Sequence, residues 1–184
     1  MNILFAASEC DPFIKTGGLA DVMGALPAEL TRQGADARVV LPKYRGIDAY
    51  WRERMEHLCH FEVLFGWERC YCGVERVIHN DVCYYFIDNE RFFSVDAIYG
   101  DGLQEGLRFA YFCRAVLEML SHIDFAPDVL HCNDWQTGLI PALLKTQYHA
   151  SPGYGSIRTV FSIHNLRHQG LFEWREINGR LGLE

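Results

Sequence analysis

The sequence predicts an α/β fold with a doubly wound, mostly parallel sheet. Short apolar runs typical of buried strands alternate along the chain with longer segments whose apolar residues recur at helical spacing. Polar residues and glycines directly follow three of these runs, at residues 8–18, 132–134 and 164–169. The carboxyl ends of parallel strands lie along one edge of a sheet, where ligands bind. We therefore expect the functional site at that edge.

The first two strands and the helix between them are predicted from the amino-terminal residues. Residues 3–7 and 37–41 are short apolar runs, and the apolar spacing of residues 19–30 predicts a helix. Pro27 lies within this helix. Because proline lacks an amide hydrogen and crowds the preceding turn, we expect it to kink or divide the helix.

The middle of the chain is rich in strand-like runs. Residues 50–58 have a mixed pattern that predicts a short helix or a loop. Three strand-like runs then follow with short breaks between them, at residues 61–65, 68–78 and 82–87. Such closely spaced runs predict antiparallel hairpins, either inserted in the parallel sheet or placed along its edge.

The remaining elements return to the alternating pattern. We expect a loop rich in aromatic residues, the longest helix, a short strand, another helix and a last strand, in this order: residues 88–102, 103–122, 127–131, 135–147 and 158–163. No internal repeat, low-complexity tract or linker interrupts this order.

The composition predicts a soluble globular protein that binds neither nucleic acid nor membranes. The chain has 184 residues, of which 49% are hydrophobic, enough to bury a sizeable core. Its formal charge is −7 and it has no clustered basic stripe, the feature that nucleic acid and anionic membranes attract. No apolar stretch approaches the roughly 20 residues of a membrane span, and the amino terminus lacks the basic region of a signal peptide. We expect a cytoplasmic location.

The cysteines indicate reduced thiols. There are seven of them, an odd number scattered without a disulfide framework. Cys70 and Cys72 are two residues apart and share one face of a predicted strand, so with His79 they form a conceivable metal site. No second pair of ligands follows at zinc-site spacing, and we expect no metal.

Residues 15–19, with the sequence KTGGL, indicate a phosphate-binding turn. Gly17 and Gly18 stand between the first strand and the first helix, where paired glycines let the backbone approach a phosphate closely. Lys15 adds a positive charge, and the helix N-terminus adds the positive end of its dipole. An ordinary strand-to-helix turn is the alternative, because the spacing matches neither the dinucleotide fingerprint nor the loop of nucleotide hydrolases.

The other two strand ends carry a carboxylate and a histidine. Asp134, or Asn133 beside it, has helix capping as its simplest role, and holding sugar hydroxyls is the alternative. His164 can donate to a sugar hydroxyl or be a satisfied structural group. A nucleophile formed by a histidine with Cys132 or Ser162 is disfavoured, because neither residue lies in a nucleophile elbow.

Taken together, these segments resemble one enzyme family. Five motifs occur in the order found in bacterial glycogen synthases and plant starch synthases: residues 15–22 (KTGGLADV), 41–44 (LPKY), 131–139 (HCNDWQTGL) and 163–166 (IHNL), followed by Gln169 and Gly170. The resemblance covers nearly the whole chain. It implies a retaining glycosyltransferase of the GT-B type, in which two Rossmann-like domains face each other across a cleft. Such enzymes transfer glucose from ADP-glucose to the non-reducing end of an α-1,4-glucan, without a metal or other cofactor.

The resemblance also implies roles for residues on the phosphate side. Lys15 would pair with the nucleotide diphosphate and count among the catalytic residues. The amides of Gly17 and Gly18 would face the same diphosphate, and Asp21 would orient the loop or contact ligand. Departure of ADP adds negative charge to the phosphate, so fixed donors there stabilise the transition state more than the ground state.

On the sugar side, the resemblance implies two further catalytic residues. Asp134 would lie near the transferred glucose or the acceptor. His164 would hold the glucose, with its backbone carbonyl near the anomeric carbon, and Asn165 would support it. Tyr99 in the aromatic loop matches a tyrosine near the substrate cleft of the family. The readable spacing contains no carboxylate pair of the kind that glycoside hydrolases use.

Two departures from the family pattern bear on function. Arg167 and His168 stand where the family commonly has a small or apolar residue and an aromatic one. The chain also ends at residue 184, before the second, nucleotide-binding domain, so residues 1–184 correspond to an incomplete amino-terminal domain that we expect to be close to inactive alone. The alternatives are a non-catalytic α-glucan-binding or regulatory module, or a two-domain glycosyltransferase that uses another sugar nucleotide.

Overall fold

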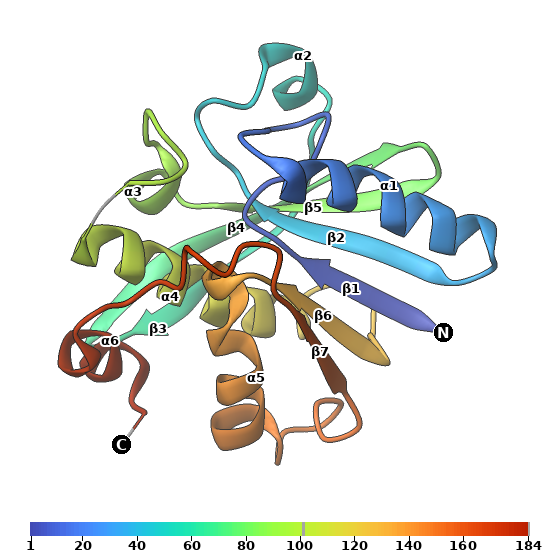
Figure 1. Cartoon of the computed structure of the whole chain (residues 1–184). Coiled ribbons are helices and arrows are strands. Elements are labelled where there is room, and N and C mark those ends of the chain that lie inside the picture. Colours follow the sequence, from blue (N-terminus) through green and yellow to red (C-terminus); the bar gives the residue numbers. More distant parts are fainter. Residues whose placement is uncertain (101, 184) are drawn as a thin grey trace.

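A seven-stranded mixed sheet forms the centre of the computed structural model, which describes residues 1–100 and 102–183 (Figure 1). The strands lie in the order β3-β4-β5-β2-β1-β6-β7 across the sheet. Their bounds are β1 Asn2–Ala6, β2 Asp36–Pro42, β3 Glu56–Phe65, β4 Glu68–His79, β5 Val82–Asp88, β6 Val129–Asn133 and β7 Arg158–Ser162. The predicted α/β class is thereby confirmed.

The helices connect the parallel strands. Their bounds are α1 Gly18–Arg32, α2 Ala49–Arg52, α3 Glu90–Phe93, α4 Leu103–Met119, the 3-10 helix η1 Trp135–Thr137, α5 Leu139–Leu143, the π-helix η2 Leu144–Tyr148 and α6 Trp174–Leu181. The chain crosses the sheet one way from β1 to β2 and the other way from β5 to β6 and β7. Right-handed crossovers therefore place α1 on one face and α4 and α5 on the other.

The burial of the central strands explains why they appear as apolar runs in the sequence. β1 is paired in parallel with β2 on one side and β6 on the other, and helices cover both of its faces. Leu4, Phe5 and Ala6 are at most 1% exposed. A strand buried on both faces gains most from a continuous apolar run, because every side chain leaves water.

The predicted hairpins form an antiparallel meander of β3, β4 and β5 at one edge of the sheet. β5 joins this meander to the parallel part by pairing with β2. β3 begins at Glu56, earlier than the apolar pattern predicts, because its first half is an edge with polar, exposed residues. Of the two predicted positions for the hairpins, inserted in the parallel sheet or along its edge, the structure has the edge position.

Other expectations about elements need correction. α1 is a single helix from Gly18 to Arg32, so Pro27 does not divide it. The segment expected as one helix, residues 135–147, consists of η1, α5 and η2 in succession. α3 and α6 were not predicted. α3 has only four residues, and α6 was passed over although Ile177 and Leu181 stand at helical spacing and are buried.

Candidate active site

A large cleft lies where the direction of strand order reverses, at the carboxyl ends of β1, β6 and β7. It has a volume of about 1070 Å³. Its walls are the loop before α1, the segment before α4, the start of η1 and the chain after β7. In Figure 1 the chain after β7 crosses in front of the beginning of α5 on its way to α6. This is the position at which doubly wound sheets bind ligands.

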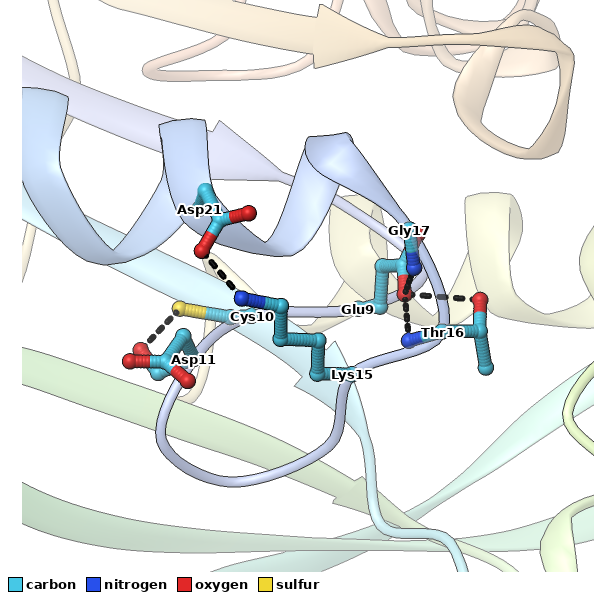
Figure 2. Close-up of polar contacts among 7 residues, drawn as sticks. All are labelled: Glu9, Cys10, Asp11, Lys15, Thr16, Gly17 and Asp21. Carbon is cyan, nitrogen blue, oxygen red and sulfur yellow. Dashed lines mark hydrogen bonds and ion pairs between the residues drawn. The ribbon is translucent and has the colours of Figure 1, made fainter.

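The loop before α1 is held by a carboxylate that the sequence analysis missed. Glu9 is only 3% exposed. Its Oε2 accepts hydrogen bonds from the Thr16 amide at 2.5 Å, the Thr16 hydroxyl at 2.8 Å and the Gly17 amide at 3.1 Å (Figure 2). The carboxylate also lies at the N-terminus of α1, where the helix dipole favours negative charge. Glu9 therefore fixes the shape of the KTGGL turn.

The two glycines consequently offer different groups to a ligand. The Gly17 amide already donates to Glu9 and is not free to face a diphosphate. Gly18 is the first residue of α1, so its amide has no acceptor within the helix. A Cβ added to Gly18 would meet no atom within 4 Å, which shows that the cleft is open in front of it. Gly18 is thus the glycine that leaves room for a ligand.

Lys15 forms an ion pair with Asp21 from the first turn of α1 (Figure 2). This hydrogen bond raises the pKa of Lys15. Both side chains are well exposed, at 48% and 60%. Neither residue is among those that line the cleft. The structure therefore places these two predicted residues beside the turn, paired with each other.

Asp134 follows β6 in a strained backbone conformation. Its φ of 56° and ψ of 178° lie near a region that only glycine adopts readily. Its side chain makes no capping hydrogen bond to η1, so the capping interpretation is wrong. Instead Oδ1 accepts from the backbone amides of His164 at 2.7 Å and Asn165 at 3.2 Å. Asp134 thereby binds the end of β6 to the chain after β7.

His164 is held through its ring as well as its backbone. Its Nε2 lies 2.9 Å from Oδ1 of Asn133, the last residue of β6. The hydroxyl of Ser162 pairs with His131 and not with His164. Burial raises the pKa of the Cys132 thiol. Among the described residues, His164 is thus hydrogen-bonded to Asn133 and Asp134, and not to Ser162 or Cys132.

Tyr99 completes the wall opposite His164. Its hydroxyl lies 2.7 Å from the hydroxyl of Ser8, which is fully buried. Burial raises the pKa of Tyr99, so the phenol stays protonated near neutral pH. Ser8 was inside the predicted polar strand end but was not singled out, since serine after a strand is common.

Most of the predicted site residues meet at this cleft. The lining includes six of them: Gly17, Gly18, Tyr99, Asp134, His164 and Asn165. Arg167 and His168, the departures from the family pattern, also line it. Within residues 1–100 and 102–183 there is no group of three or more His, Cys, Asp or Glu side chains placed to hold a metal ion.

Two further predictions from the sequence concern the state of the cysteines and the presence of membrane-spanning segments. All seven cysteines are free thiols, and Cys70 and Cys72 are buried on the inner face of β4. In the part of the chain that the structure describes, no helix has the length and apolar character needed to span a membrane.

Comparison with known proteins identifies a consistent set of relatives. A family model described as the starch synthase catalytic domain matches residues 2–184. Glycogen synthase from Geobacillus stearothermophilus is 57% identical over 172 residues, which are 94% of this chain and 35% of that protein. Glycogen synthase from Desulforamulus reducens is 50% identical over 183 residues, or 100% of this chain and 38% of that protein. The chain thus spans little more than a third of these relatives.

Two solved structures resemble the fold. The catalytic domain of starch synthase IV from Arabidopsis thaliana, bound to ADP and acarbose, superposes with a TM-score of 0.88 at 30% identity, covering 100% of this chain and 37% of that one. Sucrose-phosphate synthase from Thermosynechococcus elongatus gives a TM-score of 0.56 at 13% identity, covering 90% of this chain and 33% of that one. The second likeness concerns the fold alone.

Proposed function

Because the chain belongs to the starch synthase catalytic domain family, we propose that it is the amino-terminal part of a glycogen or starch synthase. The enzyme transfers glucose from ADP-glucose to the non-reducing end of an α-1,4-glucan, with retention at the anomeric carbon. The observation that carries the proposal is the cleft of about 1070 Å³ at the strand-order reversal, with Gly18 on one wall and His164 on the other. The solved relative bound to ADP and acarbose supports the choice of nucleotide.

Lys15 and Gly18 hold the diphosphate in this proposal. An exposed ion pair such as Lys15–Asp21 contributes little stability, because water screens both charges. A diphosphate carries more negative charge than Asp21, so it draws the lysine to itself by rotation of the flexible side chain. Asp21 then serves to keep Lys15 near the turn before the nucleotide arrives. The Gly18 amide and the dipole of α1 add a second donor to the departing phosphate.

The opposite wall holds the sugar. Asp134 fixes the backbone at His164 and Asn165, so the carbonyl of His164 has a defined position beside the sugar. As ADP departs, positive charge develops on the sugar ring, and a nearby carbonyl oxygen stabilises that charge. Asn165 and Tyr99 complete the contacts to the sugar. Strain at Asp134 is consistent with a backbone held for a functional purpose.

The 184-residue chain contributes one side of the active site. We propose that the second side comes from the part of the relatives that lies beyond the matched segment, and that the chain alone is close to inactive. Transfer requires closure of two domains on the substrate to exclude water and bring opposing phosphate ligands. The seven free thiols support a reducing, cytoplasmic location.

A chimaera tests the proposal. Residues 1–184 replace the matched segment of the Geobacillus stearothermophilus glycogen synthase, and incorporation of labelled glucose from ADP-glucose into glycogen is measured. We expect activity in the chimaera and none in the isolated chain. Lys15→Ala should lower kcat by at least about 10²-fold, since it removes a donor to the departing phosphate. Lys145→Ala, at an exposed lysine of η2, should leave activity unchanged.

Four results would count against the proposal. A chimaera that folds but transfers no glucose would remove this chain from the enzyme class, and normal activity with Lys15→Ala would remove the lysine from the site. Activity with another sugar nucleotide but not ADP-glucose would select the alternative transferase. Co-sedimentation of the isolated chain with glycogen, unaffected by Lys15→Ala but lost on substitution of the exposed Trp67, would favour the glucan-binding module.

A further inference from the structure

The side-chain amide of Asn133 has an orientation that its neighbours fix. Asn133 is fully buried at the end of β6. Its Nδ2 donates to the carbonyl of Ala6 at 3.2 Å and to the carbonyl of His131 at 3.1 Å. The reversed amide would turn its oxygen toward two carbonyl oxygens and leave three acceptors without a hydrogen. The amide therefore points its nitrogen at β1 and β6 and its oxygen toward the cleft side.

This orientation determines where the hydrogen of His164 lies. Asn133 Oδ1 can only accept, so Nε2 of His164 at 2.9 Å must carry the hydrogen of that bond. A neutral imidazole has one hydrogen, and its other nitrogen is then an acceptor. Among the described residues Nδ1 of His164 has no hydrogen-bond partner. The ring is exposed and lines the cleft, so Nδ1 is the nitrogen left for a ligand.

We infer that Asn133 is a positioning residue that fixes the neutral His164 ring as its Nε2–H tautomer, so that the ring accepts a hydrogen bond from a sugar hydroxyl at Nδ1. The sugar in this statement rests on the proposed function, whereas the tautomer rests on the three hydrogen-bonding groups around the Asn133 side chain alone. The sequence analysis considered His164 as a donor to a hydroxyl. The geometry reverses that direction and gives the hydroxyl of the sugar the donor role.

The inference also explains why an amide suits position 133. Aspartate could still accept from His164, but it would have no donor for the two carbonyls and would bury a charge against them. Alanine would remove the side-chain donor to both carbonyls and the acceptor for the ring. Of these three residues, only asparagine both donates to the carbonyls near the ends of β1 and β6 and orients the His164 ring. Because position 133 lies on a strand and not on a loop, it holds the ring in a well-defined position.

Nitrogen spectroscopy of the histidine rings tests the tautomer directly. The chain is labelled with ¹⁵N-histidine, and long-range ¹H–¹⁵N correlations are recorded at a pH where the His164 ring is neutral. His164→Gln identifies the signals of this ring among the eight histidines. We expect the pattern of an Nε2–H ring in the wild type and a mixture of tautomers in Asn133→Ala. Ser162→Ala removes the partner of His131 and should alter only the His131 signals.

An Nδ1–H pattern for wild-type His164 would overturn the inference, and so would an Asn133→Ala spectrum identical to the wild type. The wild-type pattern decides the matter even if Asn133→Ala fails to fold. In the active chimaera, Asn133→Ala should lower kcat/KM by about tenfold or more, because a freed ring loses its alignment, whereas Ser162→Ala should not. An inactive chimaera with an Nε2–H ring would refute the proposed function and leave the tautomer standing.

Discussion

Glu9 shows at the scale of a single residue how a buried charge shapes the site. It accepts three hydrogen bonds from Thr16 and Gly17, and the positive end of α1 compensates its charge. We predict that Glu9→Ala lowers the free energy of unfolding by about 2 kcal/mol, since two amides and a hydroxyl lose a charged acceptor. Glu9→Gln keeps an acceptor oxygen and should lose less. Urea denaturation of the chain measures both values.

If Glu9→Ala and Glu9→Gln lowered the free energy of unfolding equally, the effect of the charge could not be separated from the effect of the acceptor oxygen. No loss in either variant would contradict the assignment of Glu9 as the residue that holds the turn. A stable Glu9→Gln variant can also be assayed for nucleotide binding in the chimaera.

Tyr44 carries a buried hydroxyl without a partner. Its Oη has no hydrogen bond among the described residues, and burial raises the pKa of the phenol well above its ordinary value. We predict that Tyr44→Phe leaves the free energy of unfolding unchanged or raises it by up to about 1 kcal/mol, because no bond is lost and a polar atom leaves the core. Thermal and urea unfolding measure the change.

Tyr111 provides the matched control for this prediction. It is equally buried, but its hydroxyl donates to the carbonyl of Tyr71 at 2.7 Å. Tyr111→Phe removes that bond and the one that Asn89 Nδ2 donates to the hydroxyl at 3.3 Å, and it should cost about 1 kcal/mol or more. If Tyr44→Phe destabilises as much as Tyr111→Phe, the Tyr44 hydroxyl has a partner, such as a buried water.

The sequence located the site residues better than it assigned their contacts. Asp134, His164 and Gly18 were found because polar residues after strands mark the ligand edge of a parallel sheet. The bond from Asp134 to the backbone 30 residues later could not be predicted, since it depends on β6 and β7 being neighbours. For the same reason Asn133 was considered only as a cap. Glu9 could have been identified in the sequence as an acidic residue shortly before the paired glycines of the KTGGL turn.

At the scale of elements, Lys43 joins the antiparallel meander to the parallel sheet. It follows β2, and its Nζ lies 2.5 Å from Glu75 on β4 and 3.5 Å from Asp88 on β5. All three side chains are less than a quarter exposed, at 17%, 15% and 23%. We predict that Lys43→Met lowers the free energy of unfolding by about 1–3 kcal/mol, because it leaves two poorly hydrated carboxylates next to each other.

Arg69→Met is the control for this ion-pair prediction. Arg69 pairs with Glu62 across β3 and β4, but these side chains are 72% and 61% exposed. Exposed pairs contribute little, so this variant should unfold like the wild type. A similar loss in both variants would mean that Lys43 acts through its aliphatic stem and not through its charge.

Element prediction succeeded where burial dictates the pattern. β1, β2 and β6 lie in the core and were marked by apolar runs, and α4 was marked by its helical spacing. The beginning of β3 was missed because its exposed residues carry no such pattern. α6 was missed although Ile177 and Leu181, four residues apart, are buried on one face of it. Pro27 was expected to kink or divide α1 and does not divide it, because a helix packed on a sheet tolerates one lost hydrogen bond when tertiary contacts compensate. Pro27 is itself buried in that packing.

At the scale of the whole molecule, the candidate active site lies next to an edge strand of the sheet. The cleft uses the ends of β1, β6 and β7, and β7 is the outermost strand there. The chain after β7 supplies His164, Asn165, Arg167 and His168 to the cleft wall. Whatever covers β7 in a longer protein therefore also supports one wall of the proposed active site.

The outer edge of β7 leads to the last prediction. No strand in the described part of the chain pairs with this edge, and Val160, Phe161 and Ile163 are 45%, 45% and 58% exposed. An unpaired edge with apolar side chains is a template for another strand. We predict that the isolated 184-residue chain self-associates as its concentration rises, which sedimentation velocity measures. Val160→Lys should suppress association, because a charge on an edge strand must be desolvated when another strand pairs with it.

Trp67→Lys separates edge pairing from association driven by apolar exposure alone. Trp67 is 78% exposed, but it lies in the turn between β3 and β4 and belongs to neither strand. If apolar exposure alone drove association, the two lysine variants would behave alike; if pairing drives it, only Val160→Lys acts. The chimaera gives a second comparison, since it carries the remainder of the relative. Loss of association there, with Val160 unchanged, would indicate that the relative's remaining sequence covers β7, and a monomeric wild-type chain at every concentration would refute the prediction.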